Sequence, residues 1–185
     1  GDEIGMGDDL KLPERNCART PMQWSAEPQG GFTTADKPIL PVISEGPYSY
    51  QHVNTAEQRR DPKSLLNWTE RIVRMRKEIP EVGWGELEVL PMRSPAVLAL
   101  RYDWRNNSVV FLHNLSDSPR EVSFSTGVRG PEGRVLVNLL SDNHSYAAKD
   151  RKHHLLLEAY GYRWYRVGGL DYLLKRSEIE TPGRD

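Results

Sequence analysis

From about residue 82 onward the apolar residues of this chain recur at every second position, and this period limits the folds open to it. Segments rich in β-branched and aromatic residues with this pattern are typical of strands. Polar turns separate the segments, and no helical period lies between them. Short strands in succession without intervening helices predict an all-β antiparallel sandwich. The predicted strands are 86–90, 97–102, 109–114, 121–125, 134–140, 154–158 and 162–167.

One helix is predicted directly before the sandwich. Asp61 is placed to cap its N-terminus, Pro62 suits the first helical position, and Pro80 ends the helix. Apolar residues recur at spacings of three and four, which indicates one apolar face. That face consists of Leu65, Trp68, Ile72, Met75 and Ile79.

Residues 1–60 show neither of these periods. Glycine and proline interrupt every apolar stretch within about ten residues. Loops above about 12–15 residues are already uncommon in a compact domain. The segment also holds too many large apolar residues for a disordered linker, among them Trp24, Phe32, Ile39 and Tyr48. We therefore predict an ordered excursion that packs against a body outside this sequence.

Composition argues against several classes of function. The 185 residues include 25 basic and 26 acidic side chains, so no charge excess predicts binding to nucleic acid or to an anionic membrane. Apolar runs such as 96–100 are too short to span a bilayer. The single cysteine, Cys17, has no partner for an internal disulfide, which favours a reducing compartment such as the cytoplasm.

No motif predicts a metal ion or a cofactor. The histidines lack the spacing of metal ligands, and the adjacent His153 and His154 would point to opposite faces of a strand. The acidic residues within positions 2–9 lack the alternating pattern of a calcium loop. Residues 5–7 lack the further glycine of a dinucleotide-binding turn. Residue chemistry alone therefore predicts no catalytic constellation.

One loop has the chemistry of a sugar site. Arg19, Gln23 and Trp24 place a guanidinium, an amide and an indole on a loop that Pro21 stiffens. Arginine presents planar forked donors, and aromatic faces suit sugar rings. From these residues alone, Arg19 fits a structural ion pair and a ligand contact equally well.

The same loop resembles a motif of a known enzyme family. Residues 19–24, with the sequence RTPMQW, together with Gly31 and Phe32 resemble the signature of the oligo-1,6-glucosidase and trehalose synthase branch of the α-amylase superfamily. Residues 1–6 resemble the turn after the eighth barrel strand, and residues 53–66 resemble the approach to the last barrel helix. Residues 160–170 resemble the closing strand of trehalose synthases. The resemblance covers nearly all of the chain.

The resemblance implies a division of the chain into three parts. Residues 1–80 are expected to be the C-terminal end of a β/α TIM-type barrel, made of the loop excursion and the last barrel helix. Residues 81–169 are expected to form the all-β antiparallel sandwich domain, and residues 170–185 a C-terminal tail. The N-terminal part of the barrel is then a missing partner of this chain.

The family also implies a retaining mechanism on α-linked glucose disaccharides, with an aspartate nucleophile, a glutamate acid and base, and a third carboxylate. In trehalose synthases the released glucose is attached again through another hydroxyl, which interconverts maltose and trehalose. The catalytic carboxylates belong to strands upstream of these motifs, so none is assigned here, and this chain alone is expected to be inactive. Arg19 is expected to contact glucose hydroxyls and an early barrel aspartate, while Gln23 and Trp24 support the loop.

Two alternatives remain open. Residues 12–18 are partly similar to an α-glucosidase, so a hydrolase of the same branch is the first. The second is a non-catalytic carbohydrate-binding module that presents Trp84, Trp104 and Tyr146 as platforms for sugar. Scattered surface aromatics and core packing are the more ordinary explanation of such residues.

Overall fold

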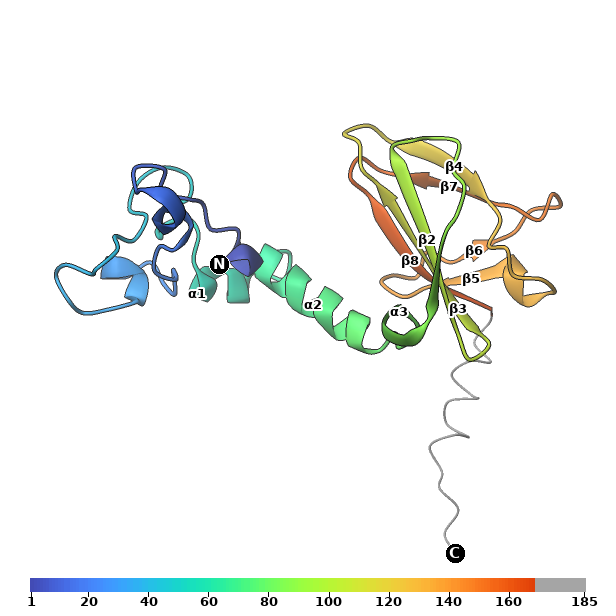
Figure 1. The fold of residues 1–185 in the computed structure, drawn as a ribbon, viewed down its shortest axis with the longest axis horizontal. Helices are drawn as coiled ribbons and strands as arrows, with labels where there is room; N and C mark the ends of the chain where they lie inside the picture. The colour runs from blue at the N-terminus through green and yellow to red at the C-terminus, as the bar shows by residue number, and fades with distance from the viewer. Residues whose placement is uncertain (169–185) are drawn as a thin grey trace, which may run out of the picture. The chain divides into compact units, whose positions relative to one another are not determined.

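The computed structural model describes residues 1–168, so the predicted tail over residues 170–185 lies outside the described residues. The chain divides into two compact units, Gly1–Arg74 and a unit that begins at Met75 (Figure 1). None of the described helices is long and apolar enough to cross a membrane.

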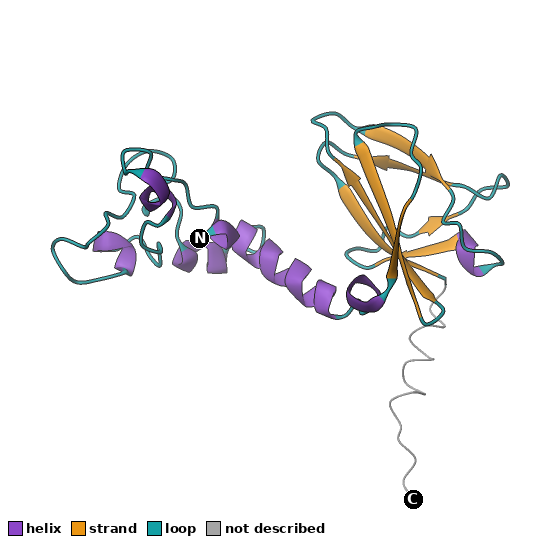
Figure 2. Cartoon of the chain, in the orientation of Figure 1, coloured by secondary structure: helices purple, strands orange, loops and turns teal. Residues whose placement is uncertain are grey.

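The unit that begins at Met75 contains two antiparallel sheets (Figures 1 and 2). Its strands are β1 (Glu86–Val89), β2 (Val97–Trp104), β3 (Asn107–Asn114), β4 (Arg120–Phe124), β5 (Val135–Asn138), β6 (Ser145–Tyr146), β7 (His153–Leu157) and β8 (Tyr162–Val167). The larger sheet has the order β1-β2-β3-β8-β5-β6, and the smaller one pairs β4 with β7. The antiparallel arrangement confirms the predicted all-β fold class of this unit.

Seven of these strands coincide with predicted segments to within a few residues. The exception is β6, which lies in a segment interpreted as a polar turn. A strand of two residues is too short to show a period. It forms because Ser145 and Tyr146 pair with Leu136 and Val135 of β5.

The main core of this unit lies between its two sheets. Residues of the larger sheet such as Ala99, Leu112 and Leu136 pack against Phe124 and Leu157 of the smaller sheet. All five side chains are almost fully buried. Removal of apolar area from water stabilises such a core by about 25 cal/mol per Å².

Strand β3 departs from the predicted alternation because both of its faces are buried. Val110 and Leu112 belong to the main core, whereas Val109 and Phe111 belong to a second cluster around Ile79. A strand that is covered on both faces has a continuous apolar run instead of an alternating one. The second cluster also includes Met75 and Val82, which brings the segment around α3 (Glu81–Trp84) into the sandwich unit.

Helix α2 (Leu65–Lys77) begins later than predicted, and the predicted cap was wrong. Asp61 Oδ1 accepts from the backbone N–H of Lys63 at 2.8 Å and therefore stabilises a turn. Ser64 Oγ accepts from the N–H of Asn67 at 3.2 Å, which is the contact of an N-cap residue. Serine and aspartate both suit such a cap, so only the path of the backbone distinguishes them.

The unit Gly1–Arg74 contains short helices and loops (Figure 2). Its helices are η1 (Asp2–Ile4), η2 (Glu14–Ala18), η3 (Pro28–Gly31), α1 (Thr55–Arg60) and the first part of α2. Helix α1 was not predicted because six residues are too few to show a helical stripe, but Asn54 caps it by accepting from Glu57 N–H at 2.9 Å.

This unit has little apolar core of its own. Ile4 and Val42 are its buried aliphatic side chains, whereas large apolar side chains elsewhere in the unit are exposed. Hydrogen bonds through Gln23 and Gln58 hold the loops together instead. The exposed group comprises Leu10, Trp24, Phe32, Ile39, Tyr48, Leu65, Trp68 and Val73.

Candidate functional site

The loop that carries the predicted site residues closes on a left-handed turn. The carbonyl of Gly30 accepts from the backbone N–H groups of Trp24, at 2.8 Å, and Ser25, at 3.0 Å. Gly30 and Gly31 have φ angles of 63° and 66°, which glycine adopts without strain. A Cβ atom on Gly31 would also lie 2.5 Å from Ser25 Oγ. The two glycines are therefore required by the turn that positions Trp24.

Gln23 is the centre of the hydrogen bonds in this loop. Its side chain is fully buried, and Nε2 donates to the carbonyls of Val53, at 2.5 Å, and Tyr48, at 3.2 Å. Its own carbonyl accepts from Thr55 N at 3.0 Å and Thr55 Oγ1 at 3.3 Å. The buried Oε1 has no hydrogen-bond partner in the described part of the chain. Gln23 thus fastens the loop to residues 48–55 and presents one unused acceptor.

Arg19 lies at the end of η2 with an exposed side chain. Its backbone N–H donates to the carbonyl of Asn16 at 3.1 Å, which fixes the main chain. The guanidinium has no hydrogen bond or ion pair with any residue between 1 and 168. The structural ion pair considered for Arg19 is therefore not formed within the described residues.

The backbone of Trp24 is fixed by hydrogen bonds, whereas its side chain is exposed. Its carbonyl accepts from Ala56 N at 3.0 Å, while 48% of the residue is exposed. Gln23 and Trp24 are therefore adjacent in the chain but differ in environment, with the amide inside the unit and the indole at its surface.

Gln58 has a role in this unit that residue patterns did not indicate. Its Nε2 donates to the carbonyl of Ile4 at 2.7 Å, and its Oε1 accepts from Leu66 N at 3.0 Å. Its carbonyl accepts from Ser64 Oγ at 2.7 Å. Ile4 lies 54 residues away in the sequence, so no local pattern could identify this contact.

Two of the aromatic residues considered as a sugar platform in the sandwich, Trp104 and Tyr146, lie far apart. Trp84 and Tyr146 are 78% and 71% exposed. Trp104 is partly buried, and the Arg105 guanidinium lies 4.4 Å from its ring centre. Three strands separate β2, which carries Trp104, from β6, which carries Tyr146, and four strand spacings amount to about 19 Å. Trp104 and Tyr146 therefore cannot contact the same sugar ring.

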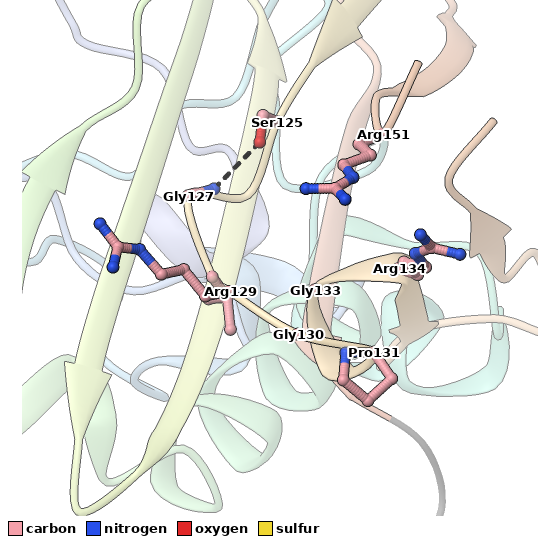
Figure 3. A pocket seen from close by; sticks show the side chains of 9 residues that line it. Ser125, Gly127, Arg129, Gly130, Pro131, Gly133, Arg134 and Arg151 are labelled. Carbon is pink, nitrogen blue, oxygen red and sulfur yellow. Dashed lines mark hydrogen bonds between the residues drawn. The ribbon is translucent and has the colours of Figure 1, made fainter. Parts of the chain in front are cut away.

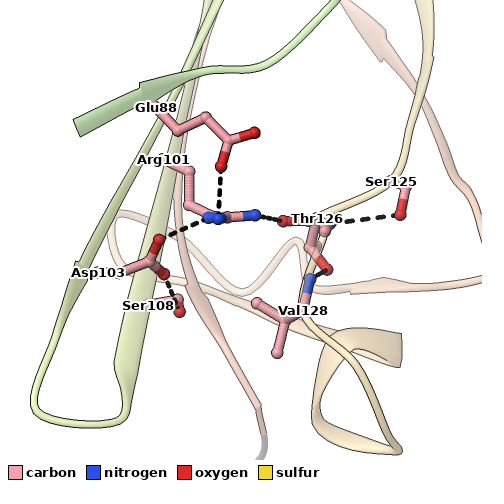
Figure 4. Close-up of polar contacts among 8 residues, drawn as sticks. Glu88, Arg101, Asp103, Ser108, Ser125, Thr126 and Val128 are labelled. Atoms are coloured by element: carbon pink, nitrogen blue, oxygen red, sulfur yellow. Dashed lines mark hydrogen bonds and ion pairs between the residues drawn. The ribbon is translucent and has the colours of Figure 1, made fainter. Parts of the chain in front are cut away.

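Beside β2, charged and polar side chains form hydrogen bonds and ion pairs with one another (Figure 4). Arg101 donates to Asp103 at 2.8 Å, to the Thr126 carbonyl at 2.7 Å, and to Glu88. Ser108 donates to the second oxygen of Asp103. The network joins three strands and the segment after β4, so we interpret it as a structural contact.

His153 is a buried link between three segments. Its Nε2 lies 3.1 Å from the Gly133 carbonyl, and its Nδ1 lies 2.9 Å from Ser145 Oγ. A carbonyl only accepts, so Nε2 carries the proton and Nδ1 of the neutral ring accepts from the hydroxyl. Burial lowers the pKa of His153. His154 is exposed, which confirms that the two histidines point to opposite faces of β7.

We expect the free energy of unfolding of the sandwich unit to fall as the pH drops below about 6.5. Burial lowers the pKa of both His153 and His113 in the folded state. The unfolded chain therefore binds more protons below that pH, and the stability present above it is lost as the pH falls. The slope reaches at most about 1.4 kcal/mol per pH unit for each histidine.

Urea unfolding between pH 7.5 and pH 5 measures this slope. His153→Gln keeps a donor for the Gly133 carbonyl and should lose part of the slope. His154→Gln removes an exposed histidine from the same strand and serves as the matched control. A slope that is unchanged in His153→Gln would contradict the assignment.

Comparison with known proteins places both units in one group of enzymes. The family profile described as "Alpha amylase, catalytic domain" matches residues 1–85, and the profile described as "Sucrose hydrolase-like, C-terminal domain" matches residues 107–166. The chain is 37% identical to a trehalose synthase of Pimelobacter sp. (strain R48), over 90% of this chain and 30% of that protein. It is 34% identical to a trehalose synthase of Thermus thermophilus, over 94% of this chain and 18% of that protein.

Among solved structures, the trehalose-6-phosphate hydrolase of Bacillus licheniformis has a similar fold. The TM-score is 0.65 at 21% identity, over 86% of this chain and 27% of that chain. At this identity the likeness concerns the fold alone. The chain spans less than a third of the length of each of these three proteins.

Proposed function

Because this chain belongs to the trehalose synthase-like enzymes of the α-amylase superfamily, we propose that the whole protein interconverts maltose and trehalose. The observation that carries the proposal is the extent of the likeness, since both trehalose synthases match 90% or more of the chain. Interconversion requires a retaining mechanism, in which a glucosyl-enzyme forms and the same glucose accepts the glucosyl group again. Both disaccharides are therefore substrates and products.

Residues 1–80 supply, in this proposal, the C-terminal end of the catalytic barrel. The α-amylase catalytic profile covers this segment, and the exposed apolar side chains of α2 support it. Leu65, Trp68 and Val73 are between 36% and 48% exposed, and an amphipathic helix is stable when such a face packs on a neighbour. The catalytic carboxylates then belong to the rest of the barrel, and this chain alone is inactive.

The unpaired acceptor of Gln23 also supports this placement. A buried acceptor without a donor costs about 1–3 kcal/mol, so folded proteins rarely leave one. Gln23 Nε2 is already used by two carbonyls, which fixes the orientation of the amide. The remaining Oε1 is thus a position at which the rest of the barrel would supply a donor.

Arg19 contacts the sugar in this proposal. Its guanidinium is exposed and unpaired within residues 1–168, while its backbone and the neighbouring loop are fixed. A planar fork of donors bonds a carboxylate and vicinal hydroxyls at the same time, which the single ammonium of lysine does not reproduce. Gln23 and Trp24 act on the sugar only through the loop that they hold.

One assay of the full-length enzyme tests both the interconversion of maltose and trehalose and the contact of Arg19 with the sugar. With maltose as substrate, we expect trehalose as the main product and little free glucose. Arg19→Lys should lower kcat/KM by about 10- to 100-fold, which corresponds to the loss of a hydrogen bond to a charged group. Arg15→Lys changes another exposed arginine, in η2, and should leave kcat/KM unchanged. The 185-residue chain should show no turnover.

Two results would contradict the proposal. Glucose as the main product would favour the alternative, a hydrolase of the same branch. Equal activities of the Arg19→Lys and Arg15→Lys enzymes would remove Arg19 from the sugar site, whatever the product.

A further inference from the structure

The sandwich unit contains a cavity of about 650 Å³ that the proposed function does not use (Figure 3). Its wall is the segment after β4, from Ser125 to Arg134, together with Arg151 of the segment before β7. Arg129, Arg134 and Arg151 belong to the lining, which includes no acidic residue. Figure 3 shows the side chains of Arg134 and Arg151 on one side of the cavity and that of Arg129 directed away from them, so the positive charge of the lining gathers at Arg134 and Arg151.

These arginines differ from three ion-paired arginines of the same unit. Arg101, Arg163 and Arg166 each form an ion pair with a carboxylate. The guanidinium groups of the three arginines in the cavity lining have no hydrogen bond or ion pair within residues 1–168. Their donors remain available to an anion from solution.

Hydrogen bonds from buried side chains fix the wall of the cavity at Gly133. The carbonyl of Gly133 accepts from His153 Nε2 at 3.1 Å and from Thr126 Oγ1 at 3.4 Å, and both side chains are buried. A Cβ atom at Gly133 would collide with the carbonyl oxygen of Val128, so the backbone is closely packed there. Ser125 Oγ accepts from Gly127 N–H at 3.3 Å (Figure 3). The segment between Arg129 and Arg134 is thus attached to the core at Gly133.

Arg151 occupies a backbone conformation that disfavours arginine. Its φ angle is 61°, in the left-handed region that glycine and asparagine adopt at lower cost. Its N–H donates to the carbonyl of Ala148 at 3.0 Å, which closes the turn. Glycine or asparagine would fit this turn at lower cost, so replacement of Arg151 by asparagine should leave the turn intact.

We propose that this cavity binds a phosphate group, either as inorganic phosphate or as a small phosphate monoester. Arginine forks match the oxygens of phosphate in bidentate pairs, and arginines from two segments suit an anion with several acceptor oxygens. The volume is within the range of about 300–1,000 Å³ that small-molecule sites occupy, so a sugar-sized group attached to the phosphate has room. The inference does not depend on the proposed activity.

Calorimetric titration of the chain with inorganic phosphate, glucose 1-phosphate and glucose tests the site. We expect saturable binding of at least one phosphate probe and none of glucose. Arg134→Gln and Arg151→Asn should each weaken that binding by about 10-fold or more, since each removes a hydrogen bond to a charged group. Because asparagine tolerates a positive φ, Arg151→Asn should not lower the Tm. Equal affinities would identify phosphate itself as the ligand, and tighter binding of glucose 1-phosphate would identify a monoester.

Arg93→Gln is the matched control, because Arg93 is an exposed arginine of the same unit that does not line this cavity. It should bind the phosphate probe as the wild type does. The proposal is overturned if neither phosphate probe gives saturable heat, if Arg93→Gln weakens binding as much as Arg134→Gln, or if glucose binds as tightly as glucose 1-phosphate.

Discussion

Replacement of Glu81 by alanine should lower the free energy of unfolding of the sandwich unit by about 3–5 kcal/mol. The Glu81 side chain is fully buried, and its Oε1 lies 2.6 Å from Nη1 of Arg166, which is 7% exposed. Without the carboxylate, a buried guanidinium would lose the counter-charge that Glu81 supplies in a medium of low dielectric constant. The pair joins α3 to β8, so its loss should also loosen the cluster around Ile79.

Denaturant unfolding of wild type and variants measures this effect. Glu158→Ala breaks the ion pair between Glu158 and Arg163 on the surface and should cost about 1 kcal/mol or less, because Glu158 is 62% exposed. The double variant Glu81→Leu with Arg166→Met should recover much of the stability, since an apolar pair removes both buried charges. A cost of Glu81→Ala as small as that of Glu158→Ala would contradict the assignment.

Leu157→Ala should cost about 2–5 kcal/mol, whereas Leu156→Ala should cost about 1 kcal/mol or less. The two residues are neighbours on β7, but Leu157 is 0% exposed and Leu156 is 52% exposed. Leu157 fills the core between the two sheets, so its truncation leaves a cavity lined by residues that cannot fully collapse.

The two variants control for each other. Both replace a leucine of β7 by alanine, so the chemical change and the change in strand propensity are the same. Thermal unfolding of both proteins should therefore give clearly different Tm values. Equal losses would contradict the assignment, and a larger loss for Leu156→Ala would mean that β7 faces the core with the opposite set of side chains, which a shift of one residue in its pairing with β4 would produce.

The positions of most strands were predictable because the period of two is a property of neighbouring residues. Strand β8 illustrates this, since the segment 162–167 was predicted and observed with the same bounds. The candidate loop was also identified by residue type, because Arg19, Gln23 and Trp24 combine groups that suit a sugar. Their roles stay predictions, whereas the hydrogen bonds of Gln23 are a finding of the structure.

The features that escaped prediction depend on residues far apart in the chain. Three consecutive leucines at 155–157 show no period, so the buried one is identified only by its place against the opposite sheet. Glu81 and Arg166 are 85 residues apart, and Gln58 and Ile4 are 54 residues apart. The arginines that line the cavity proposed to bind phosphate come from two separate segments.

Local periodicity thus determined the class of the sandwich, because alternation along a strand records which face avoids water. Tertiary structure decided which strands pair, which charges are buried together and which arginines remain without a carboxylate. Those outcomes depend on the path of the backbone, which brings together groups that no spacing in the sequence relates.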